Sequence, residues 1–135
     1  QIVASSGVSP QQLDDVLAAE YQELARCRAI YCGARKPVVL QGRTVIVVDD
    51  GVATGASMHA ALTALRGAKP EYIVVAVPAA PRGAQHRIGT AADEFISVIN
   101  TPDFRSVGQY YRDFSQVSDE QVRGFLAYAG LHRRQ

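Results

Sequence analysis

The chain has 135 residues, of which 47% are hydrophobic and 20% charged, and its formal net charge is +1. This length suits one compact domain with its own core, so we expect residues 1–135 to form a single domain. The balance of 14 basic and 13 acidic residues argues against a protein that binds nucleic acid or a membrane surface. No apolar run approaches the ~20 residues of a membrane span and no signal peptide is visible, so we expect a cytoplasmic protein.

The first segment of the chain is predicted to be a long helix that ends near Tyr31. Ser9, Pro10 and Gln12 form a helix start with a capping box, and Gly33 is a stop signal. Apolar residues recur near helical spacing and are expected to serve packing: Leu13, Val16, Leu17, Tyr21, Leu24 and Ile30.

The two cysteines, Cys27 and Cys32, both fall within this predicted helix. Residues at positions i and i+5 do not share a helix face, and one pair lacks the spacing of a zinc site. We therefore expect two unpaired thiols, as is usual in a reducing cytosol.

After the first helix, strands and helices alternate at short intervals. Residues 44–48 form a β-branched run typical of a buried parallel strand, and Pro78 is expected to end the next strand. The inward side of the helix between them is expected to carry Ala60, Ala61, Leu62 and Leu65. Strands are predicted at residues 38–40 (an edge strand), 44–48, 72–77 and 94–99, and helices at 57–66, 82–91 and from Ser118 onward. This alternation predicts an α/β fold, a parallel sheet flanked by helices.

Two acids and a loop of small residues follow the strand at 44–48. Asp49 and Asp50 stand at its carboxyl end, the edge at which open α/β sheets bind ligands. In residues 51–57, small side chains let the backbone approach a ligand closely, and the amides at the start of the next helix favour an anion. Thr54 and Ser57 add hydroxyl donors. The pattern predicts a cradle for a phosphate monoester.

The adjacent carboxylates need a partner other than the phosphate, which they would repel. Hydroxyl groups of a sugar or a divalent cation would satisfy them. Because side chains alternate at a strand end, Asp49 and Asp50 need not do the same job. Ribose 5-phosphate fits both halves of the pattern, with its phosphate in the loop and its ribose on the acids.

Other phosphate-binding motifs do not fit these residues. A P-loop NTPase requires Gly-Lys-Ser/Thr after its loop, and no lysine stands here. A dinucleotide-binding fold requires Gly-x-Gly-x-x-Gly, which Gly51 and Gly55 do not match. A receiver domain needs a phospho-acceptor Asp at the end of a later strand, and neither later strand ends in one. The simplest alternative is an ordinary strand–turn–helix connection with an acidic N-cap.

Residues 45–57 resemble the signature of type I phosphoribosyltransferases: four apolar residues, two acids and a loop ending in Thr-Gly-x-Ser/Thr. The similarity continues through residues 74–81 and 101–122, where Pro-x-Phe-x-x-Val-Gly-x-x-Tyr and Asp-Phe-Ser-Gln-x-Ser-Asp-Glu resemble a bacterial and actinobacterial branch of predicted phosphoribosyltransferases. The resemblance covers residues 9–128 in all. It implies a Rossmann-like fold and a transferase that uses phosphoribosyl pyrophosphate, Mg²⁺ and a nitrogenous base.

The resemblance also implies roles for individual residues. Asp49 and Asp50 would be catalytic, binding the ribose hydroxyls and stabilising an oxocarbenium-like transition state. No side chain would bind Mg²⁺ directly, although these two acids would reach it through water. The site for ribose 5-phosphate, whether it comes from phosphoribosyl pyrophosphate or a nucleotide 5′-phosphate, would consist of Gly51, Val52, Ala53, Thr54, Gly55, Ala56 and Ser57.

The segment after the predicted strand at 94–99 contains Phe104, Tyr110 and Tyr111. The resemblance implies base contacts there, because type I enzymes place contacts to the base in this segment. The residues themselves favour core packing, because clustered aromatic side chains usually serve it. Arg82 and Asp113 are weaker candidates, for which an exposed, solvated side chain is the simpler interpretation.

The family's pyrophosphate loop, the strand before it and a flexible loop over the site are not found in the chain, and both loops would precede Gln1. We therefore expect an N-terminally truncated domain that holds the ribose 5-phosphate half-site. Two alternatives stay open: a non-catalytic regulatory domain that binds a nucleotide or phosphoribosyl pyrophosphate, and a structural domain of a larger enzyme. A truncated sheet edge would invite pairing with another chain, which predicts a homodimer.

Overall fold

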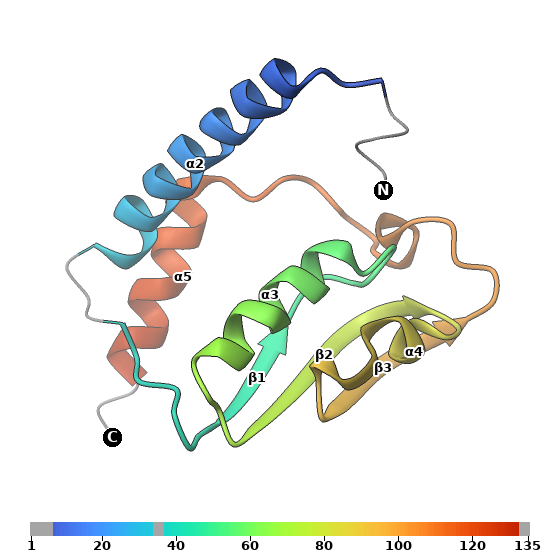
Figure 1. Cartoon of the computed structure of the whole chain (residues 1–135). Coiled ribbons are helices and arrows are strands. Elements are labelled where there is room, and N and C mark those ends of the chain that lie inside the picture. Colours follow the sequence, from blue (N-terminus) through green and yellow to red (C-terminus); the bar gives the residue numbers. More distant parts are fainter. Residues whose placement is uncertain (1–6, 34–36, 133–135) are drawn as a thin grey trace. The chain divides into compact units, whose positions relative to one another are not determined.

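The computed structural model describes residues 7–33 and 37–132 (Figure 1). The chain falls into two compact units, one made of Gln1–Lys36 and Gln116–Gln135 and the other of Pro37–Ser115. The single domain and the homodimer expected from the sequence stay predictions. None of the helices in the described residues is long and apolar enough to cross a membrane.

Helix α2 spans Pro10–Cys32 and begins with the predicted capping box. The Ser9 hydroxyl accepts a hydrogen bond from the Gln12 amide at 3.2 Å, and the Gln12 side chain accepts one from the Ser9 amide at 2.9 Å. Gly33 ends the helix with a φ of 53°, which glycine adopts at little cost. The apolar residues of α2 do not pack as expected, since none of them is buried; among the described residues of its unit, the helix lies against α5.

Helix α5 spans Asp119–His132 and also begins with the predicted capping box. The Ser118 hydroxyl accepts a hydrogen bond from the Gln121 amide at 3.3 Å, and the Gln121 side chain accepts one from the Ser118 amide at 2.9 Å. This arrangement satisfies two of the amides that a helix start leaves unpaired.

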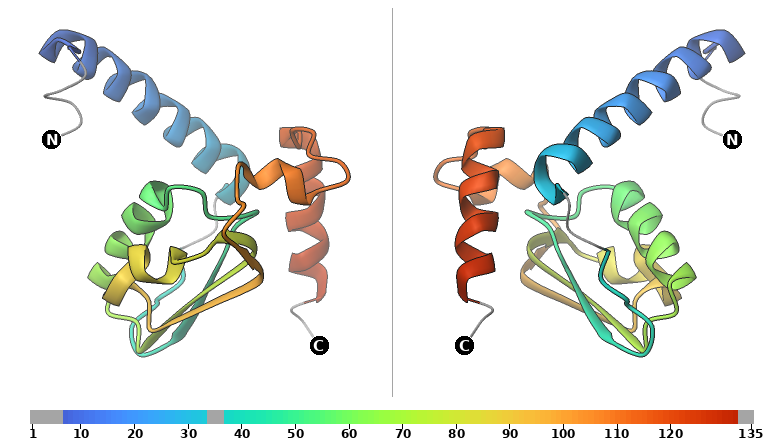
Figure 2. Two further views of the ribbon diagram at one scale, coloured as in Figure 1. Left: turned by 90° about the vertical axis from the view of Figure 1, so that its right-hand side faces the viewer. Right: turned by 90° about the vertical axis from the view of Figure 1, so that its left-hand side faces the viewer.

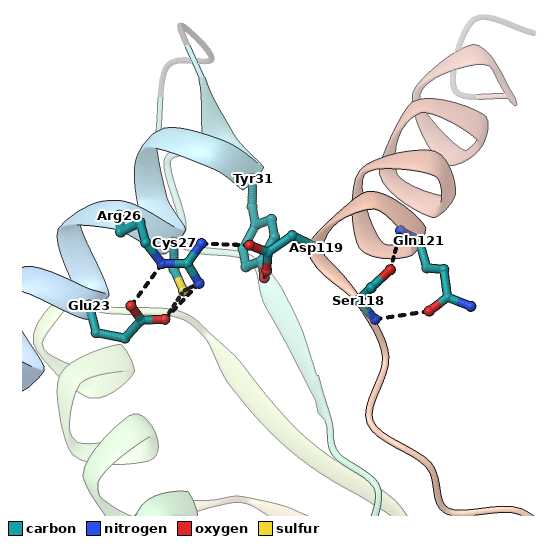
Figure 3. Close-up of polar contacts among 7 residues, drawn as sticks. All are labelled: Glu23, Arg26, Cys27, Tyr31, Ser118, Asp119 and Gln121. Atoms are coloured by element: carbon teal, nitrogen blue, oxygen red, sulfur yellow. Dashed lines mark hydrogen bonds and ion pairs between the residues drawn. The ribbon is translucent and has the colours of Figure 1, made fainter.

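A polar cluster joins α2 to the first residue of α5, as Figure 3 shows. Arg26 of α2 forms ion pairs with Glu23 at 2.7 Å and with Asp119 at 2.5 Å. The Tyr31 hydroxyl also donates to Asp119, which raises the pKa of Tyr31 to about 12. The Cys27 thiol donates to Glu23 at 3.3 Å, and both cysteines are unpaired, as predicted.

The second unit contains a parallel sheet in the order β1-β2-β3, which confirms the predicted fold class. Its strands are β1 (Thr44–Val48), β2 (Tyr72–Pro81) and β3 (Glu94–Thr101). The edge strand predicted at residues 38–40 is wrong. These residues lie outside the sheet, and the Leu40 carbonyl instead accepts a hydrogen bond from the Arg43 amide in the turn that precedes β1.

Strands β2 and β3 run further than the sequence predicted. Pro78 does not end β2, because β1 no longer pairs with β2 beyond Ala76 and a proline is tolerated at such an edge. The strand continues past the proline, with Ala79 and Ala80 paired with β3. The helix predicted at 82–91 is shorter, and consists of α4 (Ala84–Ile88) and the 3₁₀ turn η1 (Gly89–Ala91).

The core lies between the sheet and two helices on the same face, α3 (Ala56–Gly67) and α4 (Figure 2). β2 supplies the buried residues Ile73, Val75 and Val77, and α3 supplies Met58 and Leu62. The inward positions expected at Ala60 and Ala61 are wrong, since both side chains are exposed. A buried position at 58 repeats at 62, which is the spacing of one helix face.

The other face of the sheet is open within this unit. β1 was expected to be buried, yet Ile46 and Val48 are 63% and 72% exposed, because β1 is an edge strand covered on one face only. In register with them, Val74 and Ala76 of β2 are half-buried. The β-branched composition of β1 is explained by its pairing with β2 and by the packing of one of its two faces.

Candidate functional site

The candidate site is a pocket of about 230 Å³ where β1 ends and α3 begins. The nine residues predicted from the sequence for ribose 5-phosphate all line it, so one continuous strand–loop–helix segment builds most of the site. Two further lining residues, Met58 and Val107, were not predicted. The full lining is Asp49, Asp50, Gly51, Val52, Ala53, Thr54, Gly55, Ala56, Ser57, Met58 and Val107.

The two acids of this pocket differ in their hydrogen bonding. Both side chains are exposed. The Asp49 carboxylate turns back onto the chain and accepts a hydrogen bond from the Asp50 amide at 2.9 Å. Within the part of the chain that the structure describes, the Asp50 carboxylate has no hydrogen-bond partner. Asp50 therefore offers both of its oxygens to a ligand, whereas Asp49 also fixes its own loop.

The start of α3, which lies in the pocket lining, has no side-chain cap from its N-cap residue. Gly55 is the N-cap residue and has no side chain to accept a hydrogen bond from the first turn. The Ala56 amide has a long contact of 3.4 Å with the Thr54 hydroxyl. The first amides of a helix lack partners inside the helix and carry partial positive charge, so this end of the pocket suits an anion.

The backbone between the acids and the helix is held from two sides. The Val52 amide donates to the Ala79 carbonyl of β2 at 3.1 Å, and the Val52 side chain is buried. A Cβ atom on Gly51 would lie 2.8 Å from Val107 Cγ1 and 2.9 Å from the Ala79 oxygen. Only glycine fits at position 51 without a shift of its neighbours.

The aromatic segment after β3 folds against this loop. It contains the 3₁₀ turn η2 (Val107–Tyr110), and the Tyr111 hydroxyl donates to the Asp50 carbonyl at 2.7 Å. Phe104 stacks on Tyr110 with ring centroids 5.3 Å apart. The contacts that the structure shows for this segment are packing and backbone contacts, and base binding by Phe104, Tyr110 and Tyr111 stays a prediction.

The two weaker candidates lie away from the pocket lining. The Arg82 side chain is exposed, as the simpler interpretation held. Asp113 is also exposed and accepts hydrogen bonds from the Ser115 hydroxyl at 2.6 Å and the Ser115 amide at 2.9 Å. These two bonds hold the pKa of Asp113 below its ordinary value. Asp113 therefore stabilises its own turn.

A metal site made of protein side chains alone is not found in residues 7–33 and 37–132. No group of three or more His, Cys, Asp or Glu side chains there could hold a metal ion. The Mg²⁺ expected near Asp49 and Asp50 stays a prediction.

Comparison with known proteins points to one family. The sequence model of the family described as "Phosphoribosyl transferase domain" matches residues 2–115. Two proteins named "Putative phosphoribosyl transferase", from Mycobacterium tuberculosis strains CDC 1551 / Oshkosh and ATCC 25618 / H37Rv, are each 34% identical over 125 residues, 93% of this chain. The bifunctional protein PyrR of Mannheimia succiniciproducens is 41% identical over 59 residues, which are 41% of this chain and 33% of PyrR.

A solved structure is similar along nearly the whole chain. The crystal structure of TT1426 from Thermus thermophilus superposes with a TM-score of 0.75 at 37% sequence identity, and the match covers 95% of this chain and 61% of that one. The chain spans only 28% of the length of the mycobacterial relatives. The family match nevertheless includes all of β1, the loop, α3, β2 and β3. The chain belongs to the phosphoribosyl transferase domain family.

Proposed function

We propose that the protein is a Mg²⁺-dependent phosphoribosyltransferase that transfers the 5-phosphoribosyl group of phosphoribosyl pyrophosphate to a nitrogenous base. This chain would hold the ribose 5-phosphate half of the active site. The observation that carries the proposal is the pocket in which two exposed acids stand beside a helix start whose N-cap residue, Gly55, provides no side-chain cap. Family membership supports transferase chemistry, and the pocket supports the half-site.

The size and polarity of the pocket support a sugar phosphate. The pocket volume of about 230 Å³ is smaller than the roughly 300–1,000 Å³ of sites that enclose a whole small molecule. The pocket therefore suits one part of a larger substrate, such as its sugar phosphate. The amide-lined end suits the dianionic 5-phosphate, with hydroxyl donors from Thr54 and Ser57. The acidic end suits neutral hydroxyl groups, which can donate to the carboxylates of Asp49 and Asp50.

The proposed reaction forms a bond between a base nitrogen and ribose C1 and breaks the bond from C1 to pyrophosphate. Pyrophosphate leaves with the electron pair of that bond, and the base gives up a proton to water. Positive charge develops at C1 in the transition state, so the Asp49 and Asp50 carboxylates would stabilise it electrostatically. The fixed amides of residues 54–57 would keep the 5-phosphate, and with it C1, in one place during transfer.

The donor set supports a magnesium ion bound mainly by the substrate. Mg²⁺ favours carboxylate, phosphate and water oxygens, and proteins often supply one or two carboxylates only. Asp50, whose carboxylate has no protein partner in the described residues, fits that role through a water molecule. When bound, the ion would supply charge neutralisation of the departing pyrophosphate.

Pyrophosphate release by the full-length protein, measured with phosphoribosyl pyrophosphate, Mg²⁺ and a panel of bases, tests the proposal. We expect turnover with at least one base, and loss of more than about tenfold in kcat/KM in Asp50→Asn, which removes charged hydrogen bonds to the ribose. Glu71→Gln is the matched control, because it neutralises an exposed acid at the opposite end of the sheet. It should retain the parent's activity.

Two other outcomes favour other functions. Binding of phosphoribosyl pyrophosphate that weakens in Asp50→Asn, without turnover for any base, would favour the regulatory domain. If neither phosphoribosyl pyrophosphate nor any nucleotide 5′-phosphate raises the melting temperature, the pocket is not a ribose phosphate site and the proposal fails.

A further inference from the structure

We propose that Tyr111 is a positioning residue for the ribose site, and that it acts by holding the Asp50 carbonyl. Its hydroxyl donates to that oxygen at 2.7 Å from a position 61 residues further along the chain. The inference rests on the proposed function, because it concerns how the same site is held in shape.

The peptide backbone next to the Asp50 carboxylate is fixed at three consecutive residues. Tyr111 binds the Asp50 carbonyl, Val107 packs where a Cβ on Gly51 would stand, and the Val52 amide binds β2. Gly51, which follows Asp50 directly, is a residue type with little conformational preference of its own. The contacts from outside the loop therefore set the direction in which the Asp50 side chain leaves the backbone.

The segment that carries Tyr111 includes η2 and is held by contacts of its own. The Tyr111 amide donates to the Gly108 carbonyl at 3.1 Å, and the Tyr111 ring lies 5.1 Å from that of Phe114. A Cβ on Gly108 would meet Phe114 at 2.9 Å, so the turn and the ring are in close contact. A hydroxyl held by this packing can fix its acceptor, because it has little freedom to move away.

The contact should affect the two halves of the ligand differently. Tyr111 binds at Asp50, on the acidic side of the pocket. The amides that face a phosphate belong to the start of α3, whose geometry is set by Gly55 and the helix itself. Loss of the Tyr111 hydroxyl should therefore weaken contacts to the ribose and leave contacts to the phosphate in place.

Calorimetric binding of ribose 5-phosphate and of inorganic phosphate to the full-length protein separates these effects. Tyr111→Phe removes one oxygen and keeps the ring that packs on Phe114. We expect it to weaken ribose 5-phosphate by about 3- to 10-fold, the loss of one hydrogen bond, and to leave phosphate affinity within about twofold. Tyr72→Phe, the same deletion at the other end of the sheet, should match the parent for both ligands. Melting temperatures show that the variants are folded.

The remaining outcomes overturn the inference in distinguishable ways. If Tyr111→Phe binds ribose 5-phosphate as the parent does, or loses both ligands equally, Tyr111 does not position the ribose site. The proposed function survives either result if Asp50→Asn still weakens ribose 5-phosphate. If the parent protein binds neither ligand, Tyr111 has no ribose site to position and the inference fails, whereas pyrophosphate release still decides the proposed function.

Discussion

Gly51→Ala is the most direct test of how the loop is packed. The added Cβ would lie 2.8 Å and 2.9 Å from the two methyl groups of Val107, and 2.9 Å from the Ala79 carbonyl oxygen. The Val107 side chain can rotate or shift. The Ala79 oxygen cannot shift cheaply, because it belongs to the central strand and accepts the hydrogen bond of Val52.

Overpacking of this kind destabilises proteins by about 1–3 kcal/mol, and the contact with rigid backbone places Gly51→Ala toward the upper end. Urea unfolding at equilibrium measures the loss as a lower midpoint. Adding Val107→Ala removes the side-chain part of the clash and leaves the Ala79 part. The double variant should thus be less destabilised than the sum of the single variants, with a coupling of about 1 kcal/mol, yet should not recover fully.

Gly67→Ala is the matched control, because a Cβ at the end of α3 would meet nothing within 4 Å. It should be neutral or stabilise by up to about 1 kcal/mol. Equal midpoints for Gly51→Ala and the parent would refute the close approach. Full recovery in the double variant would show that Val107 alone crowds position 51, and that the Ala79 oxygen is further away than the structure gives.

Three other predictions concern the helices and the core. Gly55→Ala should destabilise by about 1–2 kcal/mol in urea, because φ at this residue is 85°. Leu62→Ala should cost about 2–5 kcal/mol because Leu62 is fully buried, whereas Leu24→Ala at an exposed site should stay within about 0.5 kcal/mol. Hydrogen bonds from Arg26 and then Tyr31 hold the pKa of Asp119 below its ordinary value. Their stabilisation is therefore present above that ordinary value and is lost as the pH falls through the lowered one. Asp119→Asn should reduce this dependence of stability on acidic pH, which unfolding monitored by circular dichroism at several pH values measures.

Local signals were enough to predict most of the elements. The capping boxes at Ser9 and Ser118 are patterns within four residues, and both are confirmed. The parallel sheet follows from the alternation of strand and helix. The error at Pro78 has a different origin, because a proline is compatible with a strand wherever the neighbouring strand has already ended. That condition depends on the length of β1 and cannot be read from β2 itself.

The burial of β1 could not be predicted from its composition. Five consecutive β-branched residues are typical of a central strand, yet β1 lies at an edge and β2 at the centre. The order of strands depends on which pairs form, and similar apolar strands do not specify that order. For the same reason, the exposure of Ile46 and Val48 could not be foreseen.

The candidate site likewise has two kinds of residue: those that are adjacent in the sequence and those that come from a distant part of the sequence. The lining from Asp49 to Ser57 was predicted because these residues adjoin one another in a strand, a loop and a helix start. Val107 was missed, and the contact of Tyr111 with Asp50 could not be foreseen, because both reach the loop from beyond β3. The resemblance at residues 101–122 indicated that this segment matters for the family's function. It did not indicate which atoms of the loop the segment contacts.

The distant contacts explain why the loop can consist of small residues. Glycine and alanine permit close approach to a ligand, but they also leave the free backbone many conformations, which binding would have to restrict at an entropic cost. Here the restriction is already made by β2 on one side and by residues 107–111 on the other. The segment after β3 is therefore part of the site even though it contributes a single residue to the pocket lining. A loop with an identical sequence, placed on a sheet without this support, would keep the amides and acids but lose their fixed directions.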